Sequence, residues 1–398
     1  MSALAPVAPQ ERLLTLDVLR GFALLGVLIA NVFWLYSTRQ FEHTAEPSIV
    51  DRVAVGLESF LVQGKAQTLL TFLFGFGFAA QLLRAEARNE PVMGIYVRRL
   101  LVLFAIGSLH VMLWWGDVTW HYGLTGFALL MFLGASNRTR LMWAAFLIFV
   151  PSTVLWGIPA VRDHFFDRHA FEQHVKPFLA AVHGKSFWPV VPAHVRFALA
   201  YLAPSVLSYF PWLVGQFLIG YVAGTQRWFD DDGRHHLRLF RRMLGYGFAC
   251  AIGNAAVAIR IHFGLQGARQ LGVAANVAIA TLSQVGMLGL TAVYVSTVVL
   301  LMQRRGWRRA ARLIAPVGRM PLTTYVSQSL VCTFLFYGWG VGWAGHVLAA
   351  QCIALALLIF AIQVLACHAW LRWFRFGPLE WVWRTLVYMH RQPMRATT

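Results

Sequence analysis

Long apolar stretches separated by short basic loops run along the whole chain. A helix needs roughly 20 mostly apolar residues to cross a bilayer, and ten segments of the sequence meet this requirement. They are residues 16–36, 60–83, 96–115, 119–135, 141–159, 197–224, 242–262, 271–302, 317–338 and 345–372. The pattern predicts an all-α, polytopic integral membrane protein with about ten transmembrane helices in a single domain, 1–398.

The sixth segment, 197–224, is interrupted by Pro204 and Pro211. Because proline removes a backbone donor and bends or ends a helix, this segment is either one kinked span or an interfacial piece followed by a span. The segments 271–302 and 345–372 are longer than a bilayer requires, so we expect them to tilt or to extend beyond the membrane.

The longest connection, 160–196, is rich in histidine and phenylalanine. This composition favours an amphipathic helix that lies on the outer membrane surface. A metal site is the alternative, but His169 and His174 are five residues apart, whereas two ligands on one helix face are best spaced by four. We therefore expect no metal. Residues 373–398 are expected to form a cytoplasmic tail.

The charge of the chain follows the predicted loops. The 34 Lys and Arg residues exceed the 16 Asp and Glu residues, which gives a formal charge of +18. In a soluble protein this excess would suggest nucleic acid as a partner, but only 13% of the residues are charged and 58% are hydrophobic. With a cytoplasmic N-terminus, 24 basic residues fall on the inner side. The positive-inside rule then predicts that both termini are cytoplasmic, with the basic face against an anionic inner leaflet.

The first predicted helix carries polar residues near both ends. Asp17 and Arg20 are three residues apart on one helix face and can pair. The pair is either an N-terminal anchor or a holder for an anionic group near the cytoplasmic face. Asn31 lies eleven residues after Arg20 and needs hydrogen-bond partners inside the bilayer, which are either another helix or a substrate.

The second predicted helix contains Lys65 and the sequence FGFG at 74–77. Lys65 either extends to the outer interface or faces a cavity. The two glycines predict close helix packing, because no strand precedes them as a nucleotide-binding loop would require. Gly220 and Gly224 likewise allow helix association without demanding an oligomer.

The turn between the third and fourth predicted helices holds the best catalytic candidates. His110 lies about one to two helical turns before the turn, Asp117 lies within it, and His121 follows four residues later. A carboxylate can fix the tautomer of an imidazole and raise its basicity, as a general base requires. The alternative is an interfacial belt, in which Trp114 and Trp115 lie at the headgroup level with polar residues around them.

The ninth predicted helix follows Arg319 and is unusually polar for a span. Its polar residues are Thr323, Tyr325, Gln328 and Ser329. They predict either a polar cavity or an interhelical network. After the tenth helix, Glu380 and Arg384 are four residues apart on a short tail helix, which we expect to act as a structural seal.

Six pieces of the sequence occur in a characteristic order. They are LDVLRGFALLGVLIAN, LLTFLFGFGFA, YVRRLLVLFAIGSLH, WWGD, GRMPLTTYVSQS and FGPLEWVWR. Together they resemble the YeiB-like bacterial membrane proteins, the family of domain of unknown function 418, over nearly the whole chain. That family is grouped with a broader set of transmembrane acyltransferases. The resemblance therefore implies a bacterial inner-membrane protein with acyl-CoA as a co-substrate.

The resemblance can be followed residue by residue. Acyltransferases of surface sugars carry an arginine in the first helix and a histidine eleven residues later; Arg20 matches the arginine, and Asn31 stands in place of the histidine. Their arginine motif at the start of the third helix is similar to Arg98 and Arg99, which could bind the phosphates of acyl-CoA. With these residues, Arg319 completes the expected donor site.

The first functional hypothesis is an acyltransferase that modifies a glycan or lipid acceptor at the outer face. The base would be His110 or His121, oriented by Asp117. Lys65 or Asn31 would stabilise the oxyanion.

The second hypothesis is a transporter or channel for a small solute or lipid, without enzymatic activity. The interrupted segment 197–224 favours it. The sequence places all acidic residues near helix ends or in loops, whereas coupled transporters often carry acids in mid-span. A non-catalytic membrane partner is the third reading.

Overall fold

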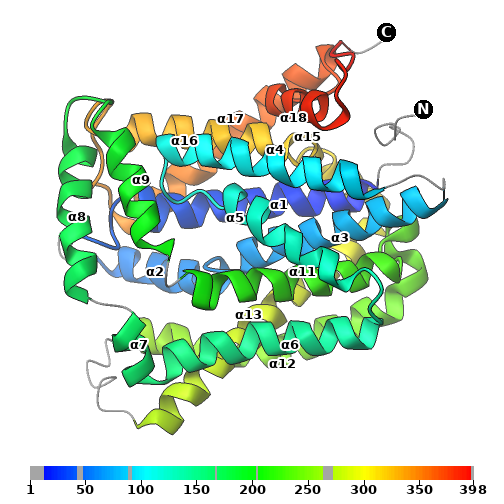
Figure 1. Cartoon of the computed structure of the whole chain (residues 1–398), viewed down its shortest axis with the longest axis horizontal. Coiled ribbons are helices and arrows are strands. Elements are labelled where there is room, and N and C mark those ends of the chain that lie inside the picture. The colour runs from blue at the N-terminus through cyan, green and yellow to red at the C-terminus, as the bar shows by residue number, and fades with distance from the viewer. Residues whose placement is uncertain are drawn as a thin grey trace.

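The computed structural model describes residues 13–42, 48–87, 92–165, 168–202, 205–262 and 272–395, most of which are helical (Figure 1). The first part of the chain forms α1 (Leu14–Ala30), η2 (Asn31–Tyr36), α2 (Ile49–Leu61), α3 (Lys65–Ala87), α4 (Val92–Leu113), α5 (Thr119–Thr125), η3 (Gly126–Phe132) and α6 (Asn137–Gly157). The middle forms α7 (Pro159–Phe165), α8 (Arg168–His183), α9 (Val190–Ala200), η4 (Ser205–Tyr209), α11 (Phe210–Thr225), η5 (Asp230–His236) and α12 (Leu237–His262). The last part forms α13 (Val273–Met302), α14 (Arg305–Ala311), α15 (Ala315–Arg319), α16 (Pro321–Phe336), α17 (Ala349–Trp373) and α18 (Pro378–Tyr388).

Within the described residues, seven helical stretches are long and apolar enough to cross a membrane. They are Leu14–Tyr36, Ile49–Ala87, Met93–Leu113, Asn137–Gly157, Ser205–Thr225, Val273–Met302 and Ala349–Trp373. The prediction of an all-α membrane protein is confirmed, while the count of ten spans and the cytoplasmic position of both termini stay predictions. Three predicted spans have no counterpart among the seven: 119–135 changes from α5 to the 3-10 helix η3 at Gly126, 242–262 falls on α12, part of which lies outside the described side chains, and α16, in 317–338, has only 16 residues.

The predicted span 60–83 is the first segment where the structure differs from the sequence pattern. Two helices, α2 and α3, meet at a turn of residues 62–64, where Gly64 has a φ of +78°. As one straight helix, Ile49–Ala87 would measure about 58 Å, twice the hydrocarbon thickness of a bilayer. The last residues of α2 are apolar, so the sequence pattern continues from α2 into α3 without a visible break. Only the turn at Gly64 separates the two helices.

In the described structure, residues 197–224 are divided between the end of α9 and a candidate span. Helix α9 ends at Ala200, and the candidate span starts at Ser205 with η4 and continues through α11. Pro204 lies outside the described residues. The connection 160–196 contains three helices instead of one, and Phe178 and Val182 of α8 are buried in the same core cluster as Phe33 of η2.

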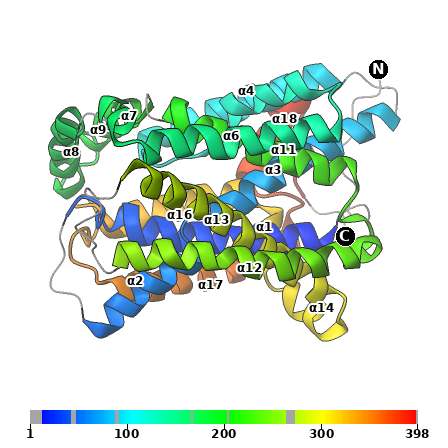
Figure 2. The same cartoon turned by 90° about the horizontal axis from the view of Figure 1, so that it is seen from below.

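The long helices run side by side along one direction, and short helices cover both ends of the bundle (Figure 1). Helix α8 crosses one end, whereas α18 and the first turn of α1 lie at the other. Turned by 90°, the bundle shows the arginine-rich α14 at that same end (Figure 2). We call the end with α14 and α18 the inner end and the end with α8 the outer end, following the charge pattern of the sequence.

Helix α18 is fixed to the start of α16 by a buried carboxylate. Glu380 is 8% exposed, and its Oε1 accepts hydrogen bonds from the backbone N–H groups of Leu322 (2.7 Å) and Thr323 (3.0 Å). Its Oε2 accepts a third bond from the Thr323 hydroxyl at 2.5 Å. A carboxylate at a helix N-terminus satisfies donors that have no partner within the helix.

Replacing Glu380 by alanine is therefore expected to lower the free energy of unfolding by about 2 kcal/mol, because three donors lose a charged acceptor. Thermal unfolding of the detergent-solubilised protein measures this loss. Glu380→Gln, which keeps an acceptor oxygen, should lose less. Equal stability of wild type and Glu380→Ala would show that α18 is not held by this carboxylate.

Candidate functional site

The outer corner between α4 and α5 is organised around one buried carboxylate. Asp117 is 1% exposed, and its Oδ2 accepts a hydrogen bond from Nδ1 of His110 at 2.7 Å. Its Oδ1 accepts from the backbone N–H groups of Thr119 (2.8 Å) and Trp120 (3.1 Å), so the same side chain also caps the first turn of α5. His110 and Asp117, which the sequence suggested as partners, are in direct contact.

The hydrogen bond of His121 defines which of its ring nitrogens is available. Nδ1 of His121 lies 3.1 Å from the backbone carbonyl of Asp117. A carbonyl only accepts, so the neutral imidazole carries its proton on Nδ1 and its lone pair on Nε2. His121 lines a cavity, whereas His110 lies behind Asp117 with its Nε2 buried and lacking a hydrogen-bond partner among the described residues. His121 is therefore the histidine placed to act as a base, and His110 is placed to orient Asp117.

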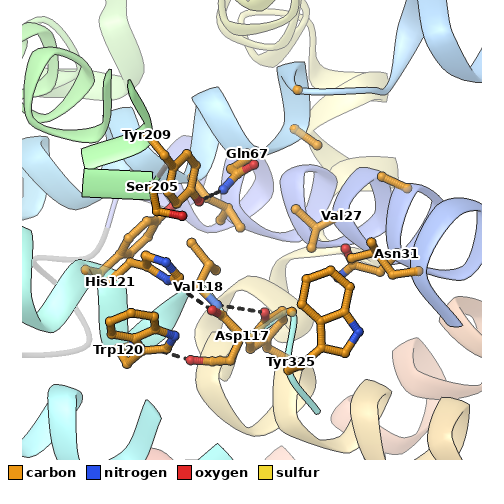
Figure 3. Close-up of a pocket in the computed structure, with 18 of the residues that line it drawn as sticks. Val27, Asn31, Gln67, Asp117, Val118, Trp120, His121, Ser205, Tyr209 and Tyr325 are labelled. Carbon is orange, nitrogen blue, oxygen red and sulfur yellow. Dashed lines mark hydrogen bonds between the residues drawn. The ribbon is translucent and has the colours of Figure 1, made fainter. Parts of the chain in front are cut away.

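The cavity beside His121, which we call the outer cavity, has a volume of about 240 Å³. Helices far apart in the sequence contribute its polar lining, and Figure 3 shows these side chains around one space. They include Asn31, Gln67, Asp117, His121, Ser205, Tyr209 and Tyr325. The Tyr325 hydroxyl accepts a hydrogen bond from the backbone N–H of Val118 at 3.4 Å, which joins α16 to the α4–α5 corner.

Asn31 lies at the point where α1 changes to the π-helix η2. Such π-helical turns are frequent at functional sites, because they alter the direction of side chains along a helix. Within the described part of the chain, the Asn31 amide makes no hydrogen bond to another side chain. Asn31 lines the outer cavity, so its amide is placed to bind a ligand there. The two alternatives, a partner helix or a substrate, stay predictions.

Four other predicted site residues lie elsewhere. Lys65 is 2% exposed and donates to the Ser59 carbonyl at 2.7 Å, behind the wall of the outer cavity. Thr323 bonds to Glu380. Gln328 donates to Gln363 at 3.0 Å, and Ser329 accepts from the Tyr36 hydroxyl at 2.8 Å. Of the polar residues in α16, Tyr325 reaches the cavity, and the rest form an interhelical network.

A second and larger cavity opens at the inner end of the bundle, and we call it the inner cavity. Its volume is about 500 Å³. Six arginines line it: Arg20, Arg84, Arg99, Arg227, Arg319 and Arg384. The acidic residues of its lining are Asp17, Asp230 and Glu380. Asp17 is paired with Arg20 at 2.9 Å, and burial raises the pKa of the Glu380 carboxyl despite its hydrogen bonds from Thr323. The cavity therefore carries an excess of positive charge.

Arg99 is the central basic group of the inner cavity. Its guanidinium carbon lies 5.6 Å from the ring centre of Phe74 and 5.2 Å from that of Trp383. Its Nε is buried without a hydrogen-bond partner in the described structure. Arg98, its neighbour in the sequence motif, instead donates to the carbonyl of Val387 at 3.0 Å and is not part of the cavity lining. A guanidinium held between two rings, with no partner for its Nε among the described residues, is suited to bind a carboxylate or a phosphate.

Some lining residues were not among the sequence candidates. Gln67 of the outer cavity is a polar residue inside a predicted span, which is a usable signal. The inner-cavity residues Trp383 and Tyr388 lie on α18, which the sequence suggested to be a seal. Their contribution depends on α18 folding back onto the bundle, and no local sequence pattern predicts that contact.

The two cavities share no lining residue. On α1 the gap extends from Arg20 to Val27, and on α16 from Pro321 to Tyr325. These separations of four to seven residues correspond to about 6–10 Å along a helix. Leu24 and Leu73, which are 2% and 3% exposed, lie within the corresponding stretches of α1 and α3. A thin apolar layer thus separates the outer from the inner cavity.

The described residues contain no group of three or more His, Cys, Asp or Glu side chains that could hold a metal ion. The four cysteines are not joined by disulfides; three are buried and Cys250 is partly buried.

The comparisons with other proteins identify a family. The family model described as protein of unknown function (DUF418) matches residues 223–390. The uncharacterized protein YxaH of Bacillus subtilis is 31% identical over 100% of both chains. The uncharacterized protein YeiB of Escherichia coli is 27% identical over 98% of this chain and 99% of its own. No solved structure matches. The chain thus belongs to the DUF418 family of YeiB-like proteins.

Proposed function

We propose that the protein is an acyltransferase of the bacterial inner membrane. It would move an acyl group from a cytoplasmic acyl-CoA to a hydroxyl or amine of a glycan or lipid at the outer face. The observation that carries this proposal is the pairing of two cavities on the same helices. One contains a histidine with a defined tautomer beside Asp117, and the other contains an unpaired arginine in a basic lining.

The donor is assigned to the inner cavity. The phosphates of acyl-CoA would bind to Arg99, Arg20 and Arg319, because guanidinium groups match phosphate oxygens in geometry and charge. Trp383 offers a planar surface next to Arg99. An anionic inner leaflet would hold the basic inner face against the membrane, and an oligomer is compatible with this arrangement.

The acceptor is assigned to the outer cavity. Nε2 of His121 would take the proton from the acceptor hydroxyl while the acceptor oxygen attacks the thioester carbonyl carbon. The Asn31 amide would donate to the developing oxyanion. When the carbon–sulfur bond breaks, the acyl group stays on the acceptor oxygen, and the proton passes from His121 to the thiolate, so that CoA leaves as its thiol. Lys65 lies behind the cavity wall, so this mechanism assigns it no contact with the substrate.

This mechanism requires the layer between the cavities to open. Leu24 and Leu73 separate the donor from the acceptor in the present conformation. The acyl chain and its thioester would have to pass this layer by a displacement of α1 against α3. The proposal therefore includes a closed state, which excludes water from the donor, and an open state, in which transfer takes place.

Acyl-CoA binding is the first test. We expect saturating acetyl-CoA to raise the thermal midpoint of the purified protein, since a ligand that binds the folded state stabilises it. Arg99→Ala should lose this shift, whereas Arg309→Ala, at the inner end but outside the cavity, should keep it. No stabilisation by acetyl-CoA or longer acyl-CoAs would contradict the proposal. His121→Gln should keep donor binding and lose transfer to the acceptor.

Transport of a small solute is the second candidate, and one observation favours it. Glu58, which the sequence placed near a helix end, is 1% exposed inside the candidate span Ile49–Ala87, next to the break between α2 and α3. Broken helices with buried charges often bind substrates or ions in transporters. Flux into liposomes without an acyl donor would support this candidate against the first.

A further inference from the structure

A buried acid and a buried base flank the turn between α2 and α3. Glu58 lies in the last turn of α2 and Lys65 is the first residue of α3. Their exposed fractions are 1% and 2%. The intervening turn is part of the wall of the outer cavity, since Val62 and Gly64 line it. The two groups thus lie directly behind the outer cavity and outside the mechanism proposed above.

The hydrogen bonds of this pair are incomplete. Oε2 of Glu58 accepts from the indole N–H of Trp34 at 2.7 Å, and Nζ of Lys65 donates to the Ser59 carbonyl at 2.7 Å. Oε1 of Glu58 and Oγ of Ser59 are buried and have no partner within the described residues. A buried ionised carboxylate normally has all its oxygens satisfied, because each unpaired oxygen costs free energy.

Both charges also lie at unfavourable helix ends. The C-terminal end of a helix carries partial negative charge and the N-terminal end carries partial positive charge. Glu58 is at the C-terminal end of α2, and Lys65 is at the N-terminal end of α3. The helices therefore destabilise the ionised form of each group, and the ionised state depends on the attraction between the two.

The surroundings supply no further charge to compensate. The charged group that acts on Glu58 is Lys65, and the one that acts on Lys65 is Glu58. The helices packed against α2 also carry charged residues, but Arg238, Arg241 and Arg242 of α12 and Arg372 of α17 are not among the charges that act on Glu58 or Lys65. The neutral titratable groups of the neighbouring helices include Tyr294 of α13, which donates to the Leu61 carbonyl, Tyr246 and Cys250 of α12, and Cys352 of α17. Asp51, at the other end of α2, is bonded to Ser48 and to the Ala350 N–H.

We propose that Glu58, with Lys65 beside it, is a proton-binding site of the outer half of the bundle. The ligand is a proton, which converts the Glu58 carboxylate to the carboxylic acid. The acid can keep its bond from Trp34, and its hydroxyl can donate to a neighbouring oxygen, such as that of Ser59. Because residues 62–64 connect the pair to the wall of the outer cavity, proton binding at Glu58 changes the shape of that wall. The site is independent of whether acyl transfer or transport takes place in the cavity.

Infrared difference spectroscopy of the purified full-length protein tests this proposal. We expect a pH-dependent band of a protonated carboxyl group that is lost in Glu58→Gln, a variant that keeps an acceptor for Trp34. In Lys65→Met the band should persist to higher pH, because the carboxylate has lost its neighbouring cation. Glu380→Gln is the matched control, since it removes another buried carboxyl and should leave this band in place.

Two variants, Glu58→Gln and Lys65→Met, test the proposal, so a folding defect in one of them still leaves a decisive measurement on the other. Identical pH-dependent spectra of wild type and Glu58→Gln would overturn the proposal. If Glu58→Gln does not fold, an unchanged band midpoint in Lys65→Met would overturn it as well. Neither readout involves an acyl donor, so failure here is distinct from failure of the acyltransferase proposal.

The link to the outer cavity has its own measurement. A cysteine introduced by Val62→Cys should react with a small water-soluble thiol reagent at a rate that depends on pH more steeply than thiol ionisation alone explains. The same cysteine in a Glu58→Gln background should show the thiol-ionisation profile only. Ala198→Cys, on the α9 side of the cavity, is the control for thiol chemistry. Equal profiles for Val62→Cys in both backgrounds would exclude the link.

Discussion

Replacing Asp117 by alanine is expected to lower the free energy of unfolding by about 4 kcal/mol. The carboxylate accepts bonds from His110 Nδ1, from the N–H and hydroxyl of Thr119, and from the Trp120 N–H. All of these donors lie in or beside a site that is 1% exposed, and each buried donor without a partner costs about 1–3 kcal/mol. Thermal or denaturant unfolding in detergent measures the loss.

Two variants control for this result. Asp117→Asn keeps an acceptor oxygen and should lose about half as much, because the charge-assisted part of each bond is lost. Asp163→Ala removes an exposed carboxylate whose side chain is 68% accessible and pairs with Arg162 on the surface. That change should be within about 0.5 kcal/mol of wild type. If Asp117→Ala were as stable as Asp163→Ala, Asp117 could not be the organising group of the corner.

The candidate site was predictable from sequence where its residues are close in the chain. His110, Asp117 and His121 fall within twelve residues, and a turn between two apolar runs necessarily brings them together. The roles of the two histidines were not predictable, because they depend on whether the ring faces the cavity. That orientation follows from the bond between His121 and the Asp117 carbonyl, which only the turn geometry determines.

Site residues that come from distant helices could not be predicted in this way. Asn31, Gln67, Tyr209 and Tyr325 come from four separate elements, and the sequence contains no signal for which faces of these helices meet. Polarity inside a span identified Asn31 and Tyr325 as candidates, but the same criterion also selected Gln328, which bonds to Gln363. Polar character therefore predicts that a buried residue has a partner and does not predict whether that partner is a helix or a ligand.

The apolar pattern predicted the membrane class for a robust reason and did not reveal the burial of Glu58, which lies at a helix end as expected, for a related one. Windows of about 20 residues average out single charges, so long spans are recognised reliably. The half-buried helix α2, with Asp51, Arg52 and Glu58 among its apolar residues, falls below such a threshold on its own. A short helix that ends inside the bundle is visible only when its neighbours are known.

The crossing of α3 and α11 is a position where a single methyl group should strongly disturb folding. A Cβ on Gly220 would lie 2.0 Å from the carbonyl oxygen of Phe72, and a Cβ on Gly75 would lie 2.0 Å from that of Phe217. The obstacle in both cases is backbone, which cannot move without separating the helices. Glycine at both positions thus permits the close approach of α3 and α11. The sequence indicated close helix packing at 74–77 but not how close it is.

We expect Gly220→Ala to cost about 3 kcal/mol or more and Gly75→Ala to behave similarly, with much of the protein lost to aggregation during expression. Monodispersity in detergent and the thermal midpoint measure this effect. Gly245→Ala is the matched control, because this glycine also lies within a helix but has no atom within 4 Å of the added methyl group. It should be neutral or gain up to about 1 kcal/mol from the higher helix propensity of alanine.

If all three variants were equally stable, α3 and α11 could not approach as closely as described. The outer cavity would then lose part of its wall, because Gln67 of α3 is hydrogen-bonded to Tyr209, which directly precedes α11, and both line that cavity.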